Sequence, residues 1–476
     1  MTTIAKNEIQ GLILRGYSNL PNAVYLLLQV NNVGDAKKWL KDISNDITNG
    51  DTKPQTTAMN IAFTLAGMKR LGLSQNALHT FSGEFEEGMS TEHKQMMFGD
   101  YGKSDPKNWN WGGPHCPEVH MMLMLYTDTS ERLETFCQAV SEKINGAGLT
   151  ILQRIDTCRP DNEKEHFGFK DGISQPFLEE LSAKGPADDP IAVGEFVLGY
   201  KNEYGQFTDS PSVLPAEDPG NLFPVQAETE NKDFGANGSY LVFRQLGQDV
   251  KGFWNFMYET TKDKSGNHVE DEAVKLAAKM VGRWPSGTSL VCSPEKDDPA
   301  LCEKNDFLYY KQDPQGLGCP YGAHVRRNHP RDCLENIPKE STSIARKHRL
   351  LRRGRSFGAP VAKSMNPADI LNTVDTSPAG SRGLNFICFN ADLGRQFEFV
   401  QNIWINNPKF NSLTDELDPF ISNPSGRGYN NETNSFTIQE KPIRKRIQNI
   451  PMFVHTMGGA YFFMPSISAV KYLAVG

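Results

Sequence analysis

The sequence predicts an α+β fold of two domains, each an antiparallel sheet with helices packed against it. Alternating strand-like and helix-like segments fill the first third of the chain, and a fainter copy of the same order follows in the second half. The chain has 476 residues, which is longer than a domain with a single hydrophobic core usually is. Two domains of ordinary size are therefore expected.

The first third holds four strand-like runs and two main helices. Apolar and β-branched residues predict strands at 23–30, 57–65, 119–126 and 149–155. Residues 35–47 have helical spacing, with Trp39, Leu40 and Ile43 on one face. Ser130 is placed to cap the helix before the fourth strand, because its hydroxyl can accept a backbone N–H in the first turn. This order of strands and helices is the ferredoxin-like pattern.

The second copy is spread over residues 239–464. Strands are predicted at 239–245, 384–389 and 460–464, and helices at 250–259 and 392–406. Residues 202–237 are rich in Asp, Pro, Gly, Asn and Ser, which is typical of a linker or a long surface loop. We therefore expect two ferredoxin-like domains, at 1–214 and 215–476.

The composition is that of a globular protein with no general affinity for polyanions. Hydrophobic residues make up 38% of the chain and charged residues 22%, and the net charge is −7. No nucleic-acid partner is expected, although residues 346–355 and 441–446 are basic islands. The second island fits a solvated surface as well as a binding site. Leucines and a glycine within the first island favour a buried anion site.

The sequence also bears on cellular location. Residues 1–8 contain no apolar stretch of the kind found in secretory signals, and no segment has the length and apolarity of a membrane span. The eight cysteines show no CxxC spacing, so neither a zinc site nor a dense disulfide framework is indicated. We expect a cytoplasmic protein with reduced thiols and no membrane partner. The oligomeric state stays open.

Three residues far apart in the chain are the strongest candidates for a reactive site. His324 follows a turn-rich segment and offers a neutral imidazole. Asp171 stands in Gly168-Phe-Lys-Asp-Gly172, where glycines let the backbone approach a flat cofactor closely. Arg352 offers a permanent cation. Each also has an ordinary explanation. His324 can be a polar residue whose hydrogen bonds are satisfied within the protein, Asp171 part of an Asp-Gly turn, and Arg352 part of a charged surface cluster.

Together these residue types suit peroxide chemistry on a heme iron. A neutral imidazole is the usual proximal ligand of peroxidase heme. A carboxylate can take a proton from one peroxide oxygen and return it to the other. A fixed cation stabilises negative charge as the O–O bond breaks. Arg326, Arg327 and Arg331 follow the histidine, and their guanidinium groups can pair with heme propionates by forked hydrogen bonds.

The chain resembles the dye-decolorizing peroxidases over nearly its whole length. Their GxxDG motif is met at 168–172, and their Ala-His-Ile-Arg-Arg-x-Asn-Pro-Arg block at 323–331, where His329 replaces the usual Asn. Their Arg-Arg-Gly-Ile-Pro-Tyr-Gly block is met at 352–358, with Arg355-Ser356 in place of Ile-Pro. Weaker blocks resemble the larger members that lack a signal and have extended loops.

The resemblance implies b-type heme, iron protoporphyrin IX, between the sheet and the helices of the C-terminal half. His324 would be the iron ligand, and Asp171 and Arg352 the catalytic pair. Asp418 is our choice for the carboxylate that hydrogen bonds to the proximal imidazole, with Asp392 as the rival. Further cofactor contacts are expected from Gly172, Ile173, Arg326, Arg331, Leu384 and Phe386.

The implied activity is reduction of hydrogen peroxide and one-electron oxidation of organic donors such as dyes and phenols. Bulky dyes do not enter a closed pocket, so oxidisable side chains are candidate electron relays, although each also fits a structural role: Tyr309, Tyr310, Trp284 and Trp404. The alternative is a heme-handling protein that transfers or senses heme, or releases its iron. The Asp171–Arg352 pair favours the peroxidase over transfer or sensing.

Overall fold

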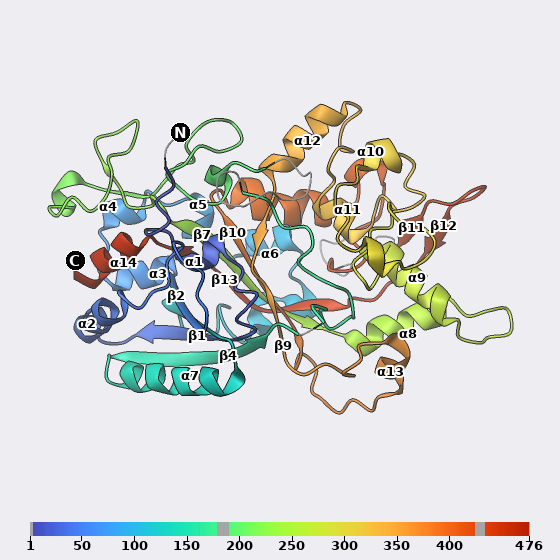
Figure 1. Cartoon of the computed structure of the whole chain (residues 1–476), viewed down its shortest axis with the longest axis horizontal. Coiled ribbons are helices and arrows are strands. Elements are labelled where there is room, and N and C mark those ends of the chain that lie inside the picture. The colour runs from blue at the N-terminus through green and yellow to red at the C-terminus, as the bar shows by residue number, and fades with distance from the viewer. Residues whose placement is uncertain (1–2, 161, 179–189, 424–433, 476) are drawn as a thin grey trace.

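Two antiparallel sheets, one from each half of the chain, join edge to edge in the computed structural model and close a barrel (Figure 1). The structure describes residues 3–160, 162–178, 190–423 and 434–475. The strand order is β7-β13-β2-β3-β1-β4-β9-β10-β8, and β10 also pairs with β7, which completes the circle. The expected α+β class with two ferredoxin-like sheets is confirmed, and the two sheets are continuous with each other.

The N-terminal sheet has the ferredoxin-like order β2-β3-β1-β4. Its strands are β1 (Asn22–Val30), β2 (Thr57–Phe63), β3 (Met121–Thr127) and β4 (Leu149–Cys158). Helices α2 (Val33–Ile43) and α7 (Ser130–Asn145) are amphipathic and bury one face each. The expected cap of α7 is wrong by one residue: Thr129 has an extended backbone, and its hydroxyl accepts the N–H of Arg132 at 3.2 Å.

The C-terminal sheet repeats this order with β13 (Val454–Met464), β7 (Ser239–Gln248) and β10 (Gly383–Asn390). Two short strands, β8 (Leu351–Arg352) and β9 (Arg355–Phe357), pair with the far edge of β10. Helix α8 is Val250–Thr260. The helix expected at 392–406 has the wide turns of a π-helix, in η6 (Gly394–Glu398) and η7 (Val400–Ile405).

The two sheets share one interior. Each seam is a single residue pair, Cys158 with Ser356 and Phe63 with Phe463. Side chains from both halves pack inside the barrel; the rings of Tyr25 and Phe243, for example, lie 5.8 Å apart edge to face. The halves therefore stabilise each other through a common core.

Residues 202–237, expected as a linker or a long surface loop, lie between β4 of the N-terminal sheet and β7 of the C-terminal sheet. They hold a small ribbon of β5 (Ser212–Val213) and β6 (Lys232–Asp233), and they bury Phe223 and Phe234 against the helical layer. A division of the chain after residue 214 passes through this ribbon. The last strand is also followed by α14 (Ile467–Val475), which packs beside α2 of the N-terminal half (Figure 1).

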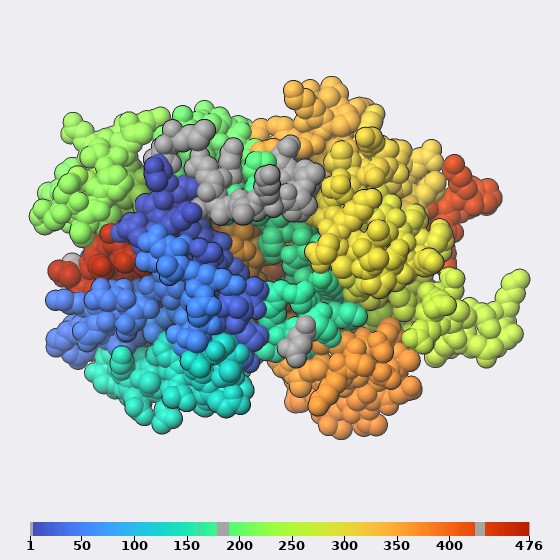
Figure 2. Space-filling model, in the orientation of Figure 1, coloured from blue at the N-terminus to red at the C-terminus, as the bar shows by residue number. Residues whose placement is uncertain are grey.

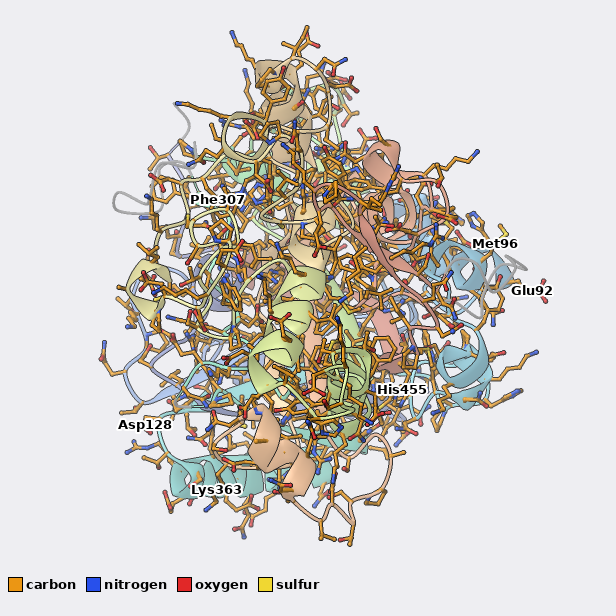
Figure 3. All side chains as sticks on the ribbon, turned by 90° about the vertical axis from the view of Figure 1, so that its right-hand side faces the viewer. Glu92, Met96, Asp128, Phe307, Lys363 and His455 are labelled. Atoms are coloured by element: carbon orange, nitrogen blue, oxygen red, sulfur yellow. The ribbon has the colours of Figure 1, made fainter. Side chains whose placement is uncertain are left out.

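The remaining segments cover the barrel. Figure 2 shows most of the surface formed by the first 150 residues, in blue to cyan, at one end of the molecule and residues near 300, in yellow, toward the other. Seen from that second end, the charged side chains of Glu92, Asp128 and Lys363 lie at the periphery (Figure 3). The shorter elements are α1 (Gly11–Leu14), α3 (Leu65–Arg70), α4 (Gln75–Leu78), α5 (Gly83–Glu87), α6 (Glu92–Phe98), α9 (Glu270–Val281), α10 (Tyr309–Gln312), α11 (His324–Asn328), α12 (Pro338–Lys347), α13 (Pro367–Asn372), the 3-10 turns η1 (Gly102–Ser104), η2 (Pro106–Asn108), η3 (Val193–Glu195), η4 (Pro215–Glu217), η5 (Pro299–Leu301) and η8 (Phe410–Ser412), and the hairpin β11 (Phe436–Ile438) with β12 (Lys445–Ile447).

None of the helices in the described part of the chain is long and apolar enough to cross a membrane. All eight cysteines lie in described segments, and none of them is in a disulfide there.

Candidate active site

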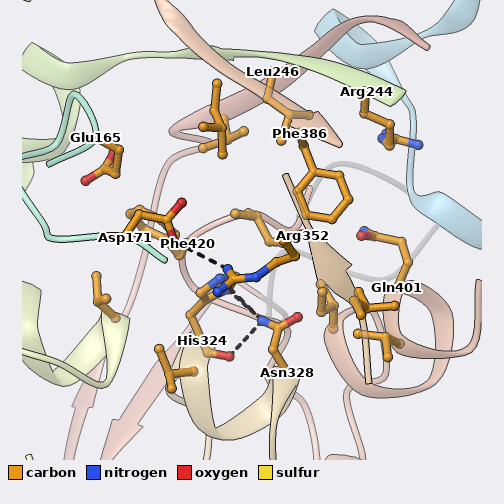
Figure 4. A pocket seen from close by; sticks show the side chains of 18 of the residues that line it. Glu165, Asp171, Arg244, Leu246, His324, Asn328, Arg352, Phe386, Gln401 and Phe420 are labelled. Carbon is orange, nitrogen blue, oxygen red and sulfur yellow. Dashed lines mark hydrogen bonds and ion pairs between the residues drawn. The ribbon is translucent and has the colours of Figure 1, made fainter. Parts of the chain in front are cut away.

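A cavity of about 250 Å³ lies between the outer face of the C-terminal sheet and the helices that cover it. Figure 4 shows side chains from several elements converging on this cavity. His324, Asp171 and Arg352 are among the residues that line it. The fold thus brings together the three residues that the sequence singled out, two of which are 181 positions apart.

A buried carboxylate fixes the imidazole of His324 at the start of α11. Nδ1 lies 2.9 Å from Oδ2 of Asp418, whose side chain is inaccessible to solvent. The backbone N–H groups of Phe420 and Ile421 donate to its other oxygen. Burial raises the pKa of Asp418, but His324 and Arg327 together outweigh it and hold the pKa below its ordinary value. Asp418 therefore accepts the Nδ1 proton, and Nε2 is left as the acceptor nitrogen.

The helix that carries His324 is itself tied down. Asn328 donates to the His324 carbonyl at 2.8 Å, and its Nδ2 lies 3.3 Å from Nε2 of the ring. The guanidinium of Arg327 is fully buried and donates to four backbone carbonyls, those of Gly322, Trp404, Asn407 and Glu416. The position of the imidazole is therefore determined by the fold before any ligand binds.

Asp171 is presented by a tight turn on the opposite side of the cavity. Gly168 and Gly172 have φ of 92° and 83°, a region that favours glycine. A Cβ on Gly168 would lie 2.7 Å from the carbonyl oxygen of Met365, so the close approach there also requires glycine. The Asp171 carboxylate accepts the N–H of Gly172 at 2.6 Å. Its side chain is 43% exposed, which leaves it accessible to a ligand in the cavity.

Arg352 comes from β8 and meets Asp171 on the same wall of the cavity. Its Nη1 lies 3.4 Å from Oδ1 of Asp171, and Gln175 accepts its backbone N–H at 3.1 Å. The ion pair is long, and the Arg352 side chain is 32% exposed. Both groups therefore keep surface that can contact a ligand in the cavity. A carboxylate and a permanent cation thus face the same space from two elements.

The sheet supplies an apolar wall. Leu384 and Phe386 alternate along β10 and lie opposite Leu246 and Arg244 of β7, so all four side chains share one face. Each of them lines the cavity. Beyond Phe386 the wall becomes polar, because Arg244 pairs with the buried Asp100 at 2.5 Å.

Comparison with known proteins agrees with this geometry. The family model of the DyP dimeric alpha+beta barrel domain matches residues 8–160. A dye-decolorizing peroxidase of Mycena epipterygia is 31% identical over 90% of this chain and 78% of its own length. The chain belongs to the dye-decolorizing peroxidase family.

Other comparisons extend the match to the whole fold. The dye-decolorizing peroxidase AauDyP1 of Auricularia auricula-judae is 27% identical over 98% of this chain and 87% of its own. A solved dye-decolorizing peroxidase structure, a complex with 2,6-dimethoxyphenol, has a TM-score of 0.77 at 25% identity and covers 99% of this chain and 100% of its own. The protein is therefore a heme-dependent peroxidase.

The residues of the cavity fit the heme that the family implies. An imidazole nitrogen, held by a carboxylate on its other side, is the ligand type required. Apolar side chains suit a porphyrin face, and two largely buried arginines on the wall, Arg283 and Arg349, can pair with propionates. Buried polar atoms of the lining, Nη1 of Arg244 and Oδ2 of Asp100, have no partner among the described residues.

The expected propionate contacts need correction in this dye-decolorizing peroxidase. Arg326, in α11, and Arg331, in the turn after it, do not line the cavity and are buried elsewhere in the protein. Arg326 is stacked between Tyr309 and Tyr321 and bonds Asp313. Arg331 lies over a phenylalanine ring, 4.0 Å from its centre, and donates to backbone carbonyls. Both arginines stabilise the fold.

The first basic island divides between site and scaffold. Arg349 and Arg352 face the cavity, whereas Arg346 forms an ion pair with Glu203 and Arg355 donates to backbone carbonyls near residue 20. Residues 441–446 of the second island are all exposed. The Arg355 substitution noted in the sequence therefore reinforces the contact between the two halves and leaves the cavity unobstructed.

His329, the second imidazole of the block, has a different environment from His324. Arg349 donates to its Nε2 at 3.0 Å, and Ser174 lies 3.5 Å from Nδ1. Burial and neighbouring arginines, Arg349 foremost, hold its pKa well below the ordinary value. It is a neutral acceptor for a guanidinium and has no carboxylate partner among the described residues, so the geometry favours His324 as the ligand.

The structure also shows where Asp392, the rival carboxylate, and the candidate electron relays lie. Asp392 pairs with Arg395 and does not line the cavity. Three of the oxidisable candidates, Trp284, Tyr309 and Trp404, are buried in the hydrophobic core. Tyr310 is 43% exposed. Core packing is sufficient to explain the first three.

Glu165 is a site residue that the sequence did not reveal. It borders the cavity six positions before Asp171, in the same sequence block. Burial raises its pKa to about 7. A glutamate in a polar turn gives no pattern that separates a surface position from a cavity wall, so only the folded structure identifies it.

Proposed function

We propose that the protein reduces hydrogen peroxide and oxidises organic donors, such as dyes and phenols, in one-electron steps, with heme b as its cofactor. The single observation that carries this proposal is the cavity that places Asp171 and Arg352 against one wall and the Asp418-backed His324 against another. The donor class follows the names of the relatives and the phenol bound in a similar structure.

Bound heme supplies the iron at which peroxide is cleaved and the oxidising power that is returned to donors. His324 provides the Nε2 lone pair for the iron, and Asp418 keeps Nδ1 as a hydrogen-bond donor, which makes the ligand more electron-rich. Because Asp418 is held by two backbone N–H groups, the ring keeps its tautomer and orientation.

On the opposite side, Asp171 moves a proton between the peroxide oxygens. It takes the proton from one oxygen and gives it to the other, which then departs as water. Arg352 stabilises the negative charge that develops during this transfer, because its guanidinium is a cation held at the same wall. Leu384 and Phe386 exclude water from the strand side of the site.

A second cavity of about 160 Å³ adjoins the first and shares five lining residues with it, which are Glu165, Asp171, Gly172, Arg352 and Leu384. We propose it as the route by which peroxide reaches Asp171. Gly172 supports this role, because nothing lies within 4 Å of the position that a Cβ would take there. A larger residue at 172 would narrow the passage.

Absorption spectroscopy tests the proposal. Purified protein should show a heme spectrum with a histidine ligand, change on addition of one equivalent of peroxide, and recover when a phenol is added. A heme transfer or sensing protein would bind heme without the rapid change. An enzyme that releases iron would yield free protoporphyrin. Either result would replace the peroxidase assignment, and pyridine extraction would identify the heme type.

We also propose a cytoplasmic location, which the eight unpaired cysteines support because disulfides persist mainly in oxidising compartments. Cell fractionation with thiol labelling tests this. Recovery of the protein with oxidised cysteines from a secreted fraction would contradict it.

A further inference from the structure

Glu165 stands at the boundary between the two cavities. It lines both of them, and so does Asp171, which places two carboxyl groups on the shared wall. Figure 4 shows both side chains on the same side of the site. Glu165 is only partly exposed and lines both cavities. The carboxyl group of Glu165 therefore borders the proposed peroxide route, as does the residue assigned to proton transfer.

Neutral groups hold the Glu165 carboxyl. Backbone N–H groups of Phe167 and Phe169 donate to it at 2.9 and 3.0 Å, and Gln248 of β7 donates at 2.8 Å. Within the described segments, no Lys, Arg or His nitrogen forms an ion pair with it. A cation would hold it permanently ionised, whereas amide donors leave the carboxyl able to gain and lose a proton.

Both negative and positive side chains surround the Glu165 carboxyl, and their effects on its pKa partly cancel. Carboxylates nearby are Asp171 and Glu163, and the latter is neutralised by Arg159 and Lys170. Other cations around the shared wall are Lys164, Arg352, Arg353 and Arg355. Burial is the main cause that raises the pKa of Glu165 to about 7, and Asp171 adds to it. The protonated and ionised forms are thus close in free energy near neutral pH.

We propose that Glu165 is a second proton-holding residue of the distal side, which exchanges a proton with Asp171 during turnover. The proposal rests on the peroxidase function and on the role of Asp171 in it. In the exchange, the Glu165 carboxylic acid loses a proton and the Asp171 carboxylate gains it. Charge is conserved and no electron moves. Solvent in the second cavity then restores the proton on Glu165.

Glu165 also shapes the turn that presents Asp171, so the test must separate proton exchange from a structural role. The neighbouring Glu163 is the matched control, because it lines the second cavity and its pKa is lowered, chiefly by Arg159. Glu165→Asp keeps a carboxyl at the position, and Glu165→Gln removes it. The pair of variants distinguishes a titrating group from a hydrogen-bond acceptor.

Infrared spectroscopy of apoprotein labelled with ¹³C-carboxyl glutamate reports the proton directly. The C=O band of a protonated labelled glutamate should disappear with a midpoint at about pH 7 in the wild type. The band should persist in Glu163→Gln and be absent from Glu165→Asp, which carries no label at this position. Wild-type protein with no band that titrates near this pH would overturn the proposal.

The pH profile of the peroxide reaction gives a second readout. An inflection near pH 7 should be present in the wild type, retained at a shifted pH in Glu165→Asp, and lost in Glu165→Gln. An unchanged profile in Glu165→Gln would overturn the proposal even if the band exists. Failure of the proposed function looks different, because heme-loaded wild type would then show the infrared band and yet not react with peroxide.

Discussion

Oδ2 of Asp418 lies 2.9 Å from Nδ1 of His324, and the carboxylate has no exposure to solvent. A buried anion of this kind is costly unless its partners compensate it, so the pair is a coupled unit. Asp418 sets the tautomer of the imidazole, and the imidazole helps to keep Asp418 ionised. The ligand and its supporting carboxylate must therefore be considered together.

Asp418→Asn should slow the peroxide reaction or weaken heme binding by about 10–100-fold, because the imidazole loses its anionic partner. The Fe–His stretching frequency in the reduced enzyme should fall at the same time. Resonance Raman and stopped-flow measurements check both effects. Asp392→Asn is the control: its carboxylate pairs with Arg395 outside the cavity, so an equal effect there would contradict our assignment.

His324→Ala should abolish the normal heme spectrum, and added imidazole should restore it in part. His329→Ala should keep the spectrum, since Arg349 and Ser174 occupy the surroundings of that ring. Absorption titration of apoprotein with heme measures both. If only the His329 variant loses the spectrum, the ligand has been assigned to the wrong imidazole.

Asp171→Asn removes the proton carrier and should lower the rate with peroxide by about 10²–10⁴-fold. Arg352→Leu removes the cation and should lower it by about 10²–10³-fold. The two residues face one space at 3.4 Å, so the double variant should lose less than the product of the single effects. Stopped-flow absorption checks these rates, and wild-type rates in both single variants would disprove the distal mechanism.

Much of the fold and of the site could be predicted from local patterns. Strands such as β1 and β10 are marked by apolar runs, and the motif at 168–172 requires glycines for its turn. Asp418 could be nominated as the partner of His324, although only the structure brings it within hydrogen-bond distance.

The remaining features depend on long-range packing. Closure of two sheets into one barrel rests on single pairs at the seams, which leave no periodic signal. Arg326 and Arg349 both stand in basic segments of the sequence. Arg326 is stacked on Tyr309 in the core, whereas Arg349 lines the cavity. Residue type is the same in both cases, and the direction of each side chain is decided by its tertiary neighbours.

Those two arginines should therefore respond differently to removal. Arg326→Ala leaves Asp313 without its cation and should lower the free energy of unfolding by about 3–5 kcal/mol. Arg349→Ala should change stability less and weaken heme binding more. Chemical denaturation of apoprotein and heme titration measure the two quantities. Weaker heme binding by Arg326→Ala with unchanged stability would restore its role as a propionate ligand.

The stability of the apoprotein should depend on pH through Glu165. Its pKa is raised from 4.5 to about 7 in the folded state, mainly by burial. Between these values the folded protein binds more protons than the unfolded chain, so the free energy of unfolding falls as the pH rises. The contribution is fully present below about pH 4.5, and up to about 3 kcal/mol is lost once the pH passes 7.

Denaturation curves of wild type and Glu165→Gln at several pH values isolate this effect. Between about pH 4.5 and 7 the wild type should lose stability relative to Glu165→Gln, and above pH 7 the difference in unfolding free energy should stay constant. Glu163→Gln should show no change between pH 4.5 and 7 and a change of the opposite sign below about pH 4.5, because the folded pKa of Glu163 is lowered from 4.5 and the stability from its ion pairs is lost as the pH falls. A difference between wild type and Glu165→Gln that does not change with pH would show that Glu165 acts only as a hydrogen-bond acceptor.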